Sequence, residues 1–164
     1  MRHRDHVIQM AAKHIQHMQK SLDHMNLHLH HVLRAITGVT GLRILRAMVA
    51  GEREPGTLAQ YRDYRITSSQ ETMAKALEGD DRSAHGFTLT PSLALYDCTQ
   101  THIAACDQDI ERVLGTFATL VDPADHPLPP PTTTHRQPQR NEPAFDLRSP
   151  LSRITGVDLT QVPG

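Results

Sequence analysis

The sequence has few aromatic residues and no tryptophan, which limits the kind of core that it can build. Only 4% of its 164 residues are aromatic, and its formal net charge is -1. Large rings supply much of the buried area in many compact cores, whereas helices that pack through Leu, Ile, Met and Ala do not need them. The composition therefore favours packed helices, and the near-zero net charge by itself predicts no polyanionic partner.

The sequence also lacks the usual features of secreted and membrane proteins. Its two cysteines, Cys98 and Cys106, stand on one expected helix, where eight residues at about 1.5 Å each place them roughly 12 Å apart, too far for a mutual disulfide. No signal peptide is apparent in residues 1–30, and no apolar run approaches the roughly 20 residues that span a bilayer. We therefore expect a cytoplasmic protein that has no membrane partner.

Sequence templates of enzymes are missing as well. The chain contains no Walker loop, no dinucleotide-binding glycine pattern, no nucleophile elbow and no His-Glu-x-x-His motif. Asp107, Asp109 and Glu111 form a local acidic cluster on the polar side of an expected helix. A solvated charged face explains this cluster better than a two-metal site does, so we assign no catalytic residue.

Two stretches of the chain carry apolar residues spaced alternately three and four apart. A repeat of 3.5 residues keeps one narrow stripe against a partner helix, as in a coiled coil. The first heptad row is Ile8, Ala11, Ile15, Met18, Leu22, Met25, Leu29 and Val32, and the second is Tyr96, Thr99, Ile103, Cys106, Ile110, Val113, Phe117 and Leu120. Two long helices, over about 4–35 and 91–120, could pair as an antiparallel hairpin or with a second copy of the chain, and the pattern leaves both open.

The distribution of proline and glycine predicts three segments. Residues 1–122 are expected to form an all-α coiled-coil region with a small helical insertion at about 36–89, in which a capping-box spacing marks a helix from about 68 to 79. Residues 123–150 hold eight of the eleven prolines, which is typical of an extended linker. Residues 151–164 are apolar and Gly-punctuated again, and we expect them to be the truncated start of another domain.

Histidine is abundant near the start of the chain, where eight of the twelve fall within residues 1–31. His24, His28 and His31 follow helical spacing on one expected face, and imidazoles one turn apart can chelate a divalent metal. No Cys, Asp or Glu on that face completes the ligand set. We therefore expect a solvated, partly cationic face and assign no metal ligand, and a His-rich metal-binding protein is the weakest functional alternative.

The segment Gly38 to Gly41 predicts a tight turn before a short helix over about 42–50. Its backbone N–H groups and the neighbouring arginines would suit a phosphate, because helix N-termini attract anions and guanidinium groups add positive charge. The alternative is a plain helix–turn–helix with solvated arginines. The candidate nucleic-acid-binding residues are Arg34, Gly38, Gly41, Arg43, Arg46 and, near the end of the chain, Gly156.

Several stretches, spread over most of 1–122 and 140–164, resemble one group of mobile-element proteins. They are HIQHMQK at 14–20, MNL at 25–27, ITGVTG at 36–41, AGEREP at 50–55, AKALEG at 74–79, ACD at 105–107 and RITGVDLT at 153–160. On these motifs the chain resembles the bacterial insertion-sequence transposases with a RuvC-like DEDD domain, the bridge-RNA-guided recombinases. The resemblance implies a role in DNA transposition and recombination, with DNA and a guide RNA as partners of the intact protein and with homo-oligomers formed through the coiled coil.

The same resemblance implies which parts of the family enzyme this chain does not match. Such enzymes place four metal-binding acids, which hold Mg²⁺, in an N-terminal domain and a nucleophilic serine in a C-terminal domain, whereas this chain resembles the region between them. No catalytic residue is therefore carried over, no cofactor is expected in this chain, and the isolated chain is expected to cut and join no DNA. The main alternative is a stand-alone helical dimerisation or regulatory module.

Overall fold

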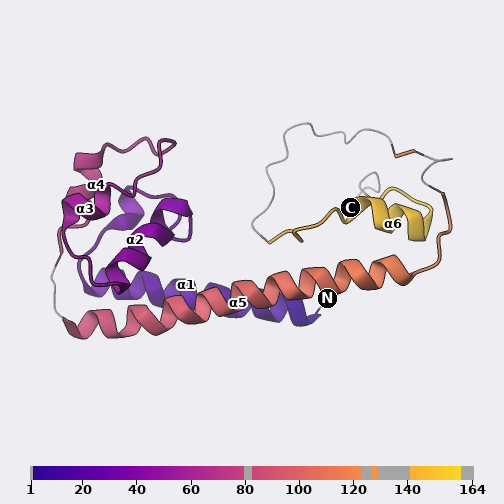
Figure 1. Cartoon of the computed structure of the whole chain (residues 1–164), viewed down its shortest axis with the longest axis horizontal. Coiled ribbons are helices and arrows are strands. Elements are labelled where there is room, and N and C mark those ends of the chain that lie inside the picture. Colours follow the sequence, from indigo (N-terminus) through magenta and orange to yellow (C-terminus); the bar gives the residue numbers. More distant parts are fainter. Residues whose placement is uncertain (1, 80–82, 123–126, 129–140, 160–164) are drawn as a thin grey trace. The chain divides into compact units, whose positions relative to one another are not determined.

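The computed structural model describes residues 2–79, 83–122, 127–128 and 141–159. These residues are mostly helical and include no strand, which confirms the predicted all-α class (Figure 1). None of the helices in the described ranges is long and apolar enough to cross a lipid bilayer. The elements are α1 (Arg2–His24), the 3₁₀ helix η1 (Leu29–His31), α2 (Val39–Val49), α3 (Pro55–Ala59), α4 (Gln70–Ala76), α5 (Ser83–Thr116) and α6 (Arg148–Thr155).

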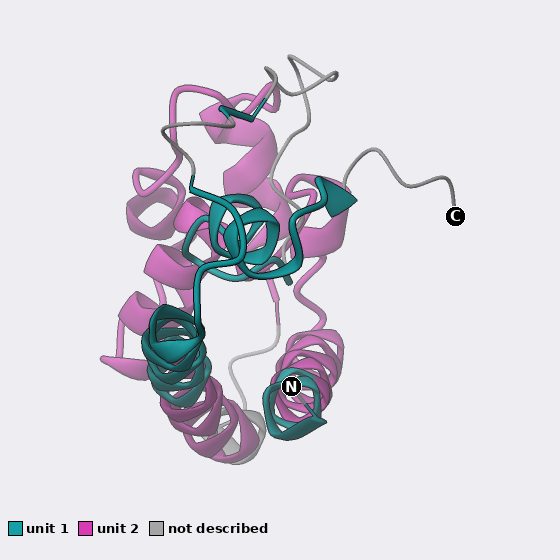
Figure 2. Cartoon of the chain, turned by 90° about the vertical axis from the view of Figure 1, so that its right-hand side faces the viewer, with its two compact units in different colours: residues 1–8, 101–164 teal, residues 9–100 magenta. Residues whose placement is uncertain are grey.

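The chain divides into two compact units, and α1 and α5 each contribute to both (Figure 2). Unit 1 comprises residues 1–8 and 101–164, and unit 2 comprises residues 9–100. The predicted linker at 123–150 lies largely outside the described residues, as do residues 160–164 of the last predicted segment. The most deeply buried large side chains are all aliphatic and all in unit 2: Met18, Leu29, Ile44, Leu45 and Met73. This core needs no aromatic ring at its centre, as the composition predicts.

The first long helix is shorter than its heptad pattern predicts. α1 ends at His24, and two residues later Asn26 takes a left-handed backbone conformation with a φ of 56°. Asn tolerates this region better than most residues, and one residue in it is enough to end a helix. Leu29 therefore lies in η1 and Val32 follows η1, so the prediction that both continue the first heptad row on one helix is wrong.

A tertiary contact explains this early end. The backbone N–H of His28 donates to the carbonyl of Ala76 at the end of α4, over 3.0 Å. The backbone of Gly79 also passes so close to the Met25 carbonyl that a Cβ on Gly79 would lie 2.3 Å from that oxygen. These backbone contacts direct the chain from the end of α1 toward the end of α4, and a continued helix would lose them. The local periodicity contains no information about them.

The second long helix begins earlier than predicted. α5 starts at Ser83 and contains Pro91, which we expected in its first turn. An interior proline costs about 3 kcal/mol because it removes a backbone hydrogen bond and its ring clashes with the preceding turn. The turn before Pro91 is nevertheless well anchored, because Leu89 is buried and the Thr88 hydroxyl lies 2.8 Å from the Ser21 hydroxyl on α1. Packing within unit 2 thus offsets the local preference.

The two heptad rows differ in burial along their length. In the first row Ala11, Met18, Leu22 and Met25 are buried, and Ile8 and Ile15 are half-buried. In the second row Tyr96 and Thr99 are buried and Ile103, Cys106 and Ile110 are half-buried, whereas Val113, Phe117 and Leu120 are 46%, 50% and 70% exposed. The second row is thus covered within unit 2 and increasingly exposed toward its C-terminal end. α5 ends at Thr116, so the prediction that Phe117 and Leu120 continue the row on the same helix is wrong.

Unit 1 is organised around a buried ion pair. Arg4 donates to both carboxylate oxygens of Asp107, and the side chains of this pair are only 10% and 6% exposed. Arg4 also donates to the carbonyl of Asn141, and Asp107 accepts from the backbone N–H of Ala144. The prediction that Asp107 belongs to a solvated acidic face is therefore wrong, because its carboxylate is the hydrogen-bonding centre of three chain segments. Its neighbour Asp109 is exposed, as expected.

The helical insertion follows its local signals more closely. α2 covers the expected short helix and starts three residues earlier, at Val39. α4 begins after Ser69, whose hydroxyl accepts from the backbone N–H of Thr72. The capping-box spacing predicts Ser68 as the cap, with Glu71 three residues later, so the helix starts one residue later than this signal places it. The first turn of α2 packs tightly on the chain before it, since a Cβ on Gly41 would lie 2.1 Å from the carbonyl oxygen of Ile36. Only glycine fits there.

Replacing Gly41 with alanine is expected to destabilise unit 2 by about 1–3 kcal/mol or more, because the new methyl group would push the Ile36 backbone away from α2. The matched control is Gly115→Ala in α5, where an added Cβ meets nothing within 4 Å. That variant should gain roughly 0.5–1 kcal/mol from lower backbone entropy of the unfolded chain. Urea denaturation followed by circular dichroism measures both, and equal stabilities of the two variants would contradict the close contact.

Candidate nucleic-acid interface

The turn before α2 exposes the start of a helix whose own first turn contains no acidic residue. Gly38 is the N-cap of α2, no side chain caps that end, and no Asp or Glu lies in the first turn. Unpaired N–H groups and the helix dipole give such an end a partial positive charge. The turn itself is closed by the backbone N–H of Gly38, which donates to the Ala35 carbonyl over 3.1 Å.

A groove of about 380 Å³ adjoins this turn. Three of the predicted residues, Arg34, Gly38 and Gly41, line it together with Asp63 and Arg65 from the segment between α3 and α4. The hydroxyl of Thr40, in the first turn of α2, accepts from the backbone N–H of Asp63 over 2.9 Å and joins the two segments. The structure thus brings half of the predicted nucleic-acid-binding residues to one place.

Asp63 is the acidic group of the groove, and a cation balances it. The Arg65 guanidinium donates to Asp63 at 2.8 Å, and this hydrogen bond, followed by one from the Arg65 backbone, lowers the pKa of Asp63 from 3.8 to about 2. The charge on Arg43 lowers this pKa further. Asp63 is therefore ionised at neutral pH, and its single negative charge faces more than one arginine.

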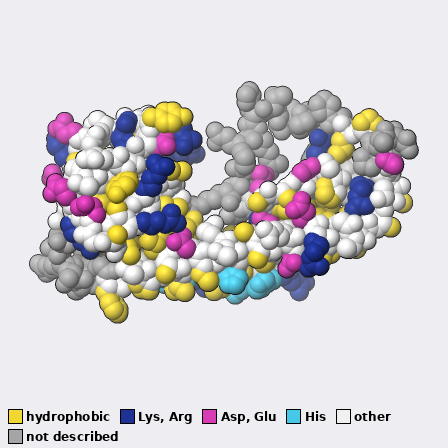
Figure 3. Space-filling model, in the orientation of Figure 1, with side chains coloured by type: hydrophobic (Ala, Val, Ile, Leu, Met, Phe, Trp, Pro, Cys, Tyr) yellow, Lys and Arg dark blue, Asp and Glu magenta, His cyan; other side chains and the backbone are white. Residues whose placement is uncertain are grey.

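Aromatic surface lies next to these charges. The Tyr64 side chain is 85% exposed, and the Arg65 guanidinium carbon lies 5.6 Å from the centre of its ring. An exposed ring beside guanidinium groups can stack on a nucleobase while the cations contact the phosphate backbone. Figure 3 shows Lys and Arg side chains over the part of unit 2 formed by α2 to α4, interspersed with acidic ones.

The other predicted residues lie apart from the groove lining. Arg43 is exposed on α2, and Arg46 on the same helix pairs with Asp97 of α5 at 3.0 Å, so part of its charge is already balanced. Gly156 belongs to unit 1 and is the C-cap of α6, with a φ of 73°. This left-handed conformation gives Gly156 a structural reason to be glycine. The sequence did not identify Asp63, Tyr64 or Arg65, because nothing local links them to a turn more than twenty residues away.

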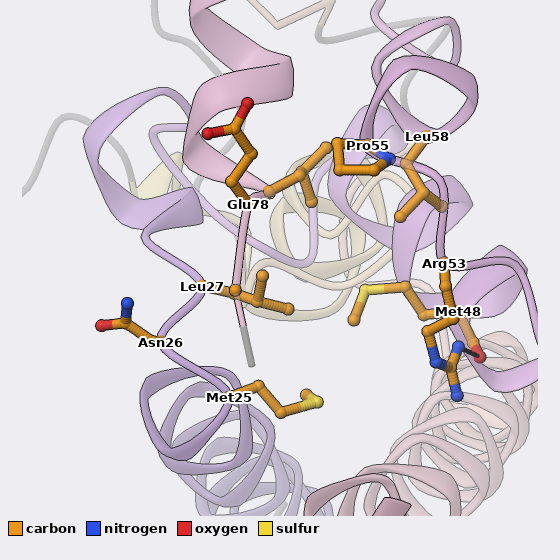
Figure 4. A pocket seen from close by; sticks show the side chains of 10 residues that line it. Met25, Asn26, Leu27, Met48, Arg53, Pro55, Leu58 and Glu78 are labelled. Carbon is orange, nitrogen blue, oxygen red and sulfur yellow. Dashed lines mark hydrogen bonds between the residues drawn. The ribbon is translucent and has the colours of Figure 1, made fainter. Parts of the chain in front are cut away.

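A second cavity among the described residues contains no catalytic arrangement. It measures about 710 Å³ and lies between the ends of α1, α2 and α4 and the start of α3 (Figure 4). Its charged side chains are Arg53, which donates to the Met48 carbonyl, and Glu78, and the rest of its lining is mainly apolar. No nucleophile, acid or base in it is paired as acid–base chemistry requires.

The described residues also provide no fit for the magnesium that the family resemblance implies. Mg²⁺ prefers oxygen ligands in octahedral geometry. The one group of three or more His, Cys, Asp or Glu side chains that converges within the described ranges consists of His28, His30 and His31, with no carboxylate among them. We therefore assign no catalytic step through magnesium to this chain.

Comparisons with known proteins leave the family of the chain open, because no family model, curated protein or solved structure matches it.

Replacing Arg65 with glutamine should raise the pKa of Asp63 from about 2 toward 3.8, because the largest cause of its lowering is the hydrogen bond from that guanidinium. A titration of the Asp63 carboxyl carbon by NMR measures this shift. Arg112→Gln, which removes the partner of Asp109 in unit 1, serves as the control and should leave Asp63 unchanged. An unshifted Asp63 in the Arg65 variant would show that the pair is not formed in solution.

Proposed function

We propose that this chain acts in DNA transposition, as a helical region of an insertion-sequence transposase that contributes nucleic-acid contact and dimerisation rather than catalysis. The observation that carries the proposal is the convergence of Arg34 and Arg65 on the glycine turn before α2. The resemblance of residues 36–41 to that transposase group falls on the same turn. Structure and sequence therefore favour the same segment by independent arguments.

The chemistry of the groove favours a phosphate backbone as its ligand. Guanidinium groups bind phosphate oxygens in a fixed fork, and the uncapped start of α2 adds N–H donors at the same place. Asp63 already engages Arg65, which holds that guanidinium at the rim of the groove. Contacts of this kind position a nucleic acid without reading its sequence. DNA and a structured guide RNA are both consistent with this mode, and Tyr64 supplies a stacking surface for an unpaired base.

The dimerisation part of the proposal rests on the heptad rows. The hairpin form is supported by a contact between the helices in each unit, which is the hydrogen bond between the Ser21 and Thr88 hydroxyls in unit 2 and the ion pair of Arg4 with Asp107 in unit 1. Near the end of α5 the second row is half exposed at Val113, and Phe117, the first residue after the helix, is half exposed as well. Exposed apolar residues that keep a heptad spacing are what a coiled coil with a second copy requires.

Nucleic-acid binding is tested by fluorescence anisotropy with a labelled DNA duplex and a labelled RNA hairpin over a range of salt concentrations. The double variant Arg34→Gln and Arg43→Gln should bind more weakly to the duplex, and the slope of log K against log salt should fall by up to about 1.8, since each phosphate contact contributes about 0.9. Its control is the double variant Arg2→Gln and Arg112→Gln, which removes the same charge from exposed positions in unit 1. If both double variants lose the same affinity for the duplex, net charge alone explains the loss, and a specific interface is contradicted.

Dimerisation is tested by sedimentation equilibrium across a dilution series. We expect the dissociation constant of the dimer to rise at least tenfold in the variant Val113→Asp and Phe117→Asp, because charge on the second heptad row opposes its burial. Ala104→Asp, on the same helix but outside the row, should leave association unchanged. A wild-type chain that stays monomeric at all concentrations would refute the dimer. That result would not bear on the arginine interface, which the anisotropy experiment tests.

A further inference from the structure

Three histidines converge at the short helix that follows α1. The ligand atoms of His28, His30 and His31 all lie within 4.8 Å of one another, and all three side chains are exposed. The ring centres of His30 and His31 are 4.1 Å apart, and that of His28 lies 5.9 and 5.6 Å from them. This grouping differs from the helical set His24, His28 and His31, because α1 ends at His24 and η1 turns the chain differently.

The backbone under this cluster is held from several sides. Leu29, between the histidines, is fully buried, and Leu33 is 7% exposed. The N–H of His28 is bonded to the carbonyl of Ala76 in α4, and the N–H of His31 donates to the carbonyl of His28 over 3.0 Å. Only the imidazole rings therefore have to reorient when a ligand binds. Folding has already ordered the backbone, so ligand binding does not include that loss of entropy.

The spacing is close to what a metal needs. With Zn–N bonds of 2.0–2.1 Å, neighbouring ligands of a tetrahedral site lie about 3.4 Å apart. Exposed imidazoles within 4.8 Å reach that separation by small rotations about their side-chain bonds. Neutral imidazole is a borderline ligand that suits Zn²⁺, Ni²⁺, Cu²⁺ and Co²⁺ and not Mg²⁺ or Ca²⁺. Three nitrogens leave at least one coordination position for water, as in exposed three-histidine zinc sites.

We propose that His28, His30 and His31 form a binding site for a borderline divalent transition metal, with zinc as its reference ion. The site shares no residue with the arginine groove, so metal binding is tested separately from nucleic-acid binding. Bound metal links the residue before η1 to two residues within it and so stabilises the turn between α1 and α2. Because folding holds the three rings side by side, metal binds the folded chain more tightly than the unfolded one and raises the melting temperature of unit 2.

The experiment uses the untagged full chain, so that no engineered histidines contribute. Co²⁺ is titrated while its visible absorption bands are recorded, and Zn²⁺ is then added to displace it and measured by calorimetry. We expect one metal per chain, the absorption intensity of a four- or five-coordinate site, and a higher melting temperature with Zn²⁺ that EDTA reverses. Binding that is only weak and non-stoichiometric, without the absorption bands of a four- or five-coordinate site, would overturn the proposal.

Variants identify the ligands. The single variant His30→Ala should weaken Zn²⁺ binding at least about tenfold, whereas His24→Ala should bind as wild type does, because His24 is not part of the cluster. The triple variant His28→Ala, His30→Ala and His31→Ala should lose the site. The matched triple control His3→Ala, His6→Ala and His17→Ala removes as many exposed histidines from α1. Equal losses in the two triple variants, or a larger loss in His24→Ala than in His30→Ala, would overturn the assignment, and circular dichroism without metal verifies that each variant folds.

Discussion

The close approach of α2 to the chain before it is the constraint on which the arginine groove of unit 2 depends. Gly41 lies so near the Ile36 backbone that no side chain fits between them. That contact closes the turn at Gly38, sets the direction in which α2 leaves it, and leaves the uncapped helix start facing the groove with Arg34. A wider turn would separate these groups, and the proposed contacts with phosphate would be lost.

The two units rely on different interactions. Unit 2 is held by an aliphatic core that includes Ile44 and Leu45 of α2, and it carries both the arginine groove and the histidine cluster at its surface. Unit 1 has little apolar burial and is joined by charged groups, among them the ion pair of Arg4 with Asp107 and that of Arg148 with Asp158. A buried pair of this kind contributes structural specificity more than net stability, because desolvation offsets much of its attraction. Both proposed binding sites, the arginine groove and the histidine cluster, therefore lie in unit 2, which has the aliphatic core.

The sequence predicted what depends on neighbours in the chain and missed what depends on distant contacts. The all-α class, a helix start near Ser69 and the turn at Gly38 follow from local spacing. The end of α1 does not, because the contacts from α4 that divert the chain lie some fifty residues away. For the same reason the sequence did not predict that Arg65 lines the groove or that His30 belongs to the histidine cluster. The heptad spacing identified apolar positions, but it did not distinguish burial in one chain from pairing with another.

An NMR titration of the isotope-labelled chain with an unlabelled DNA duplex tests most directly whether the turn before α2 contacts nucleic acid. We expect the backbone amides from Gly38 to Leu42 and the Arg34 and Arg65 side-chain signals to shift together and to saturate together. The amides of residues 104–112 in α5 should keep their positions. Shifts spread evenly over all exposed arginines, or confined to segments outside the groove, would contradict the proposed interface.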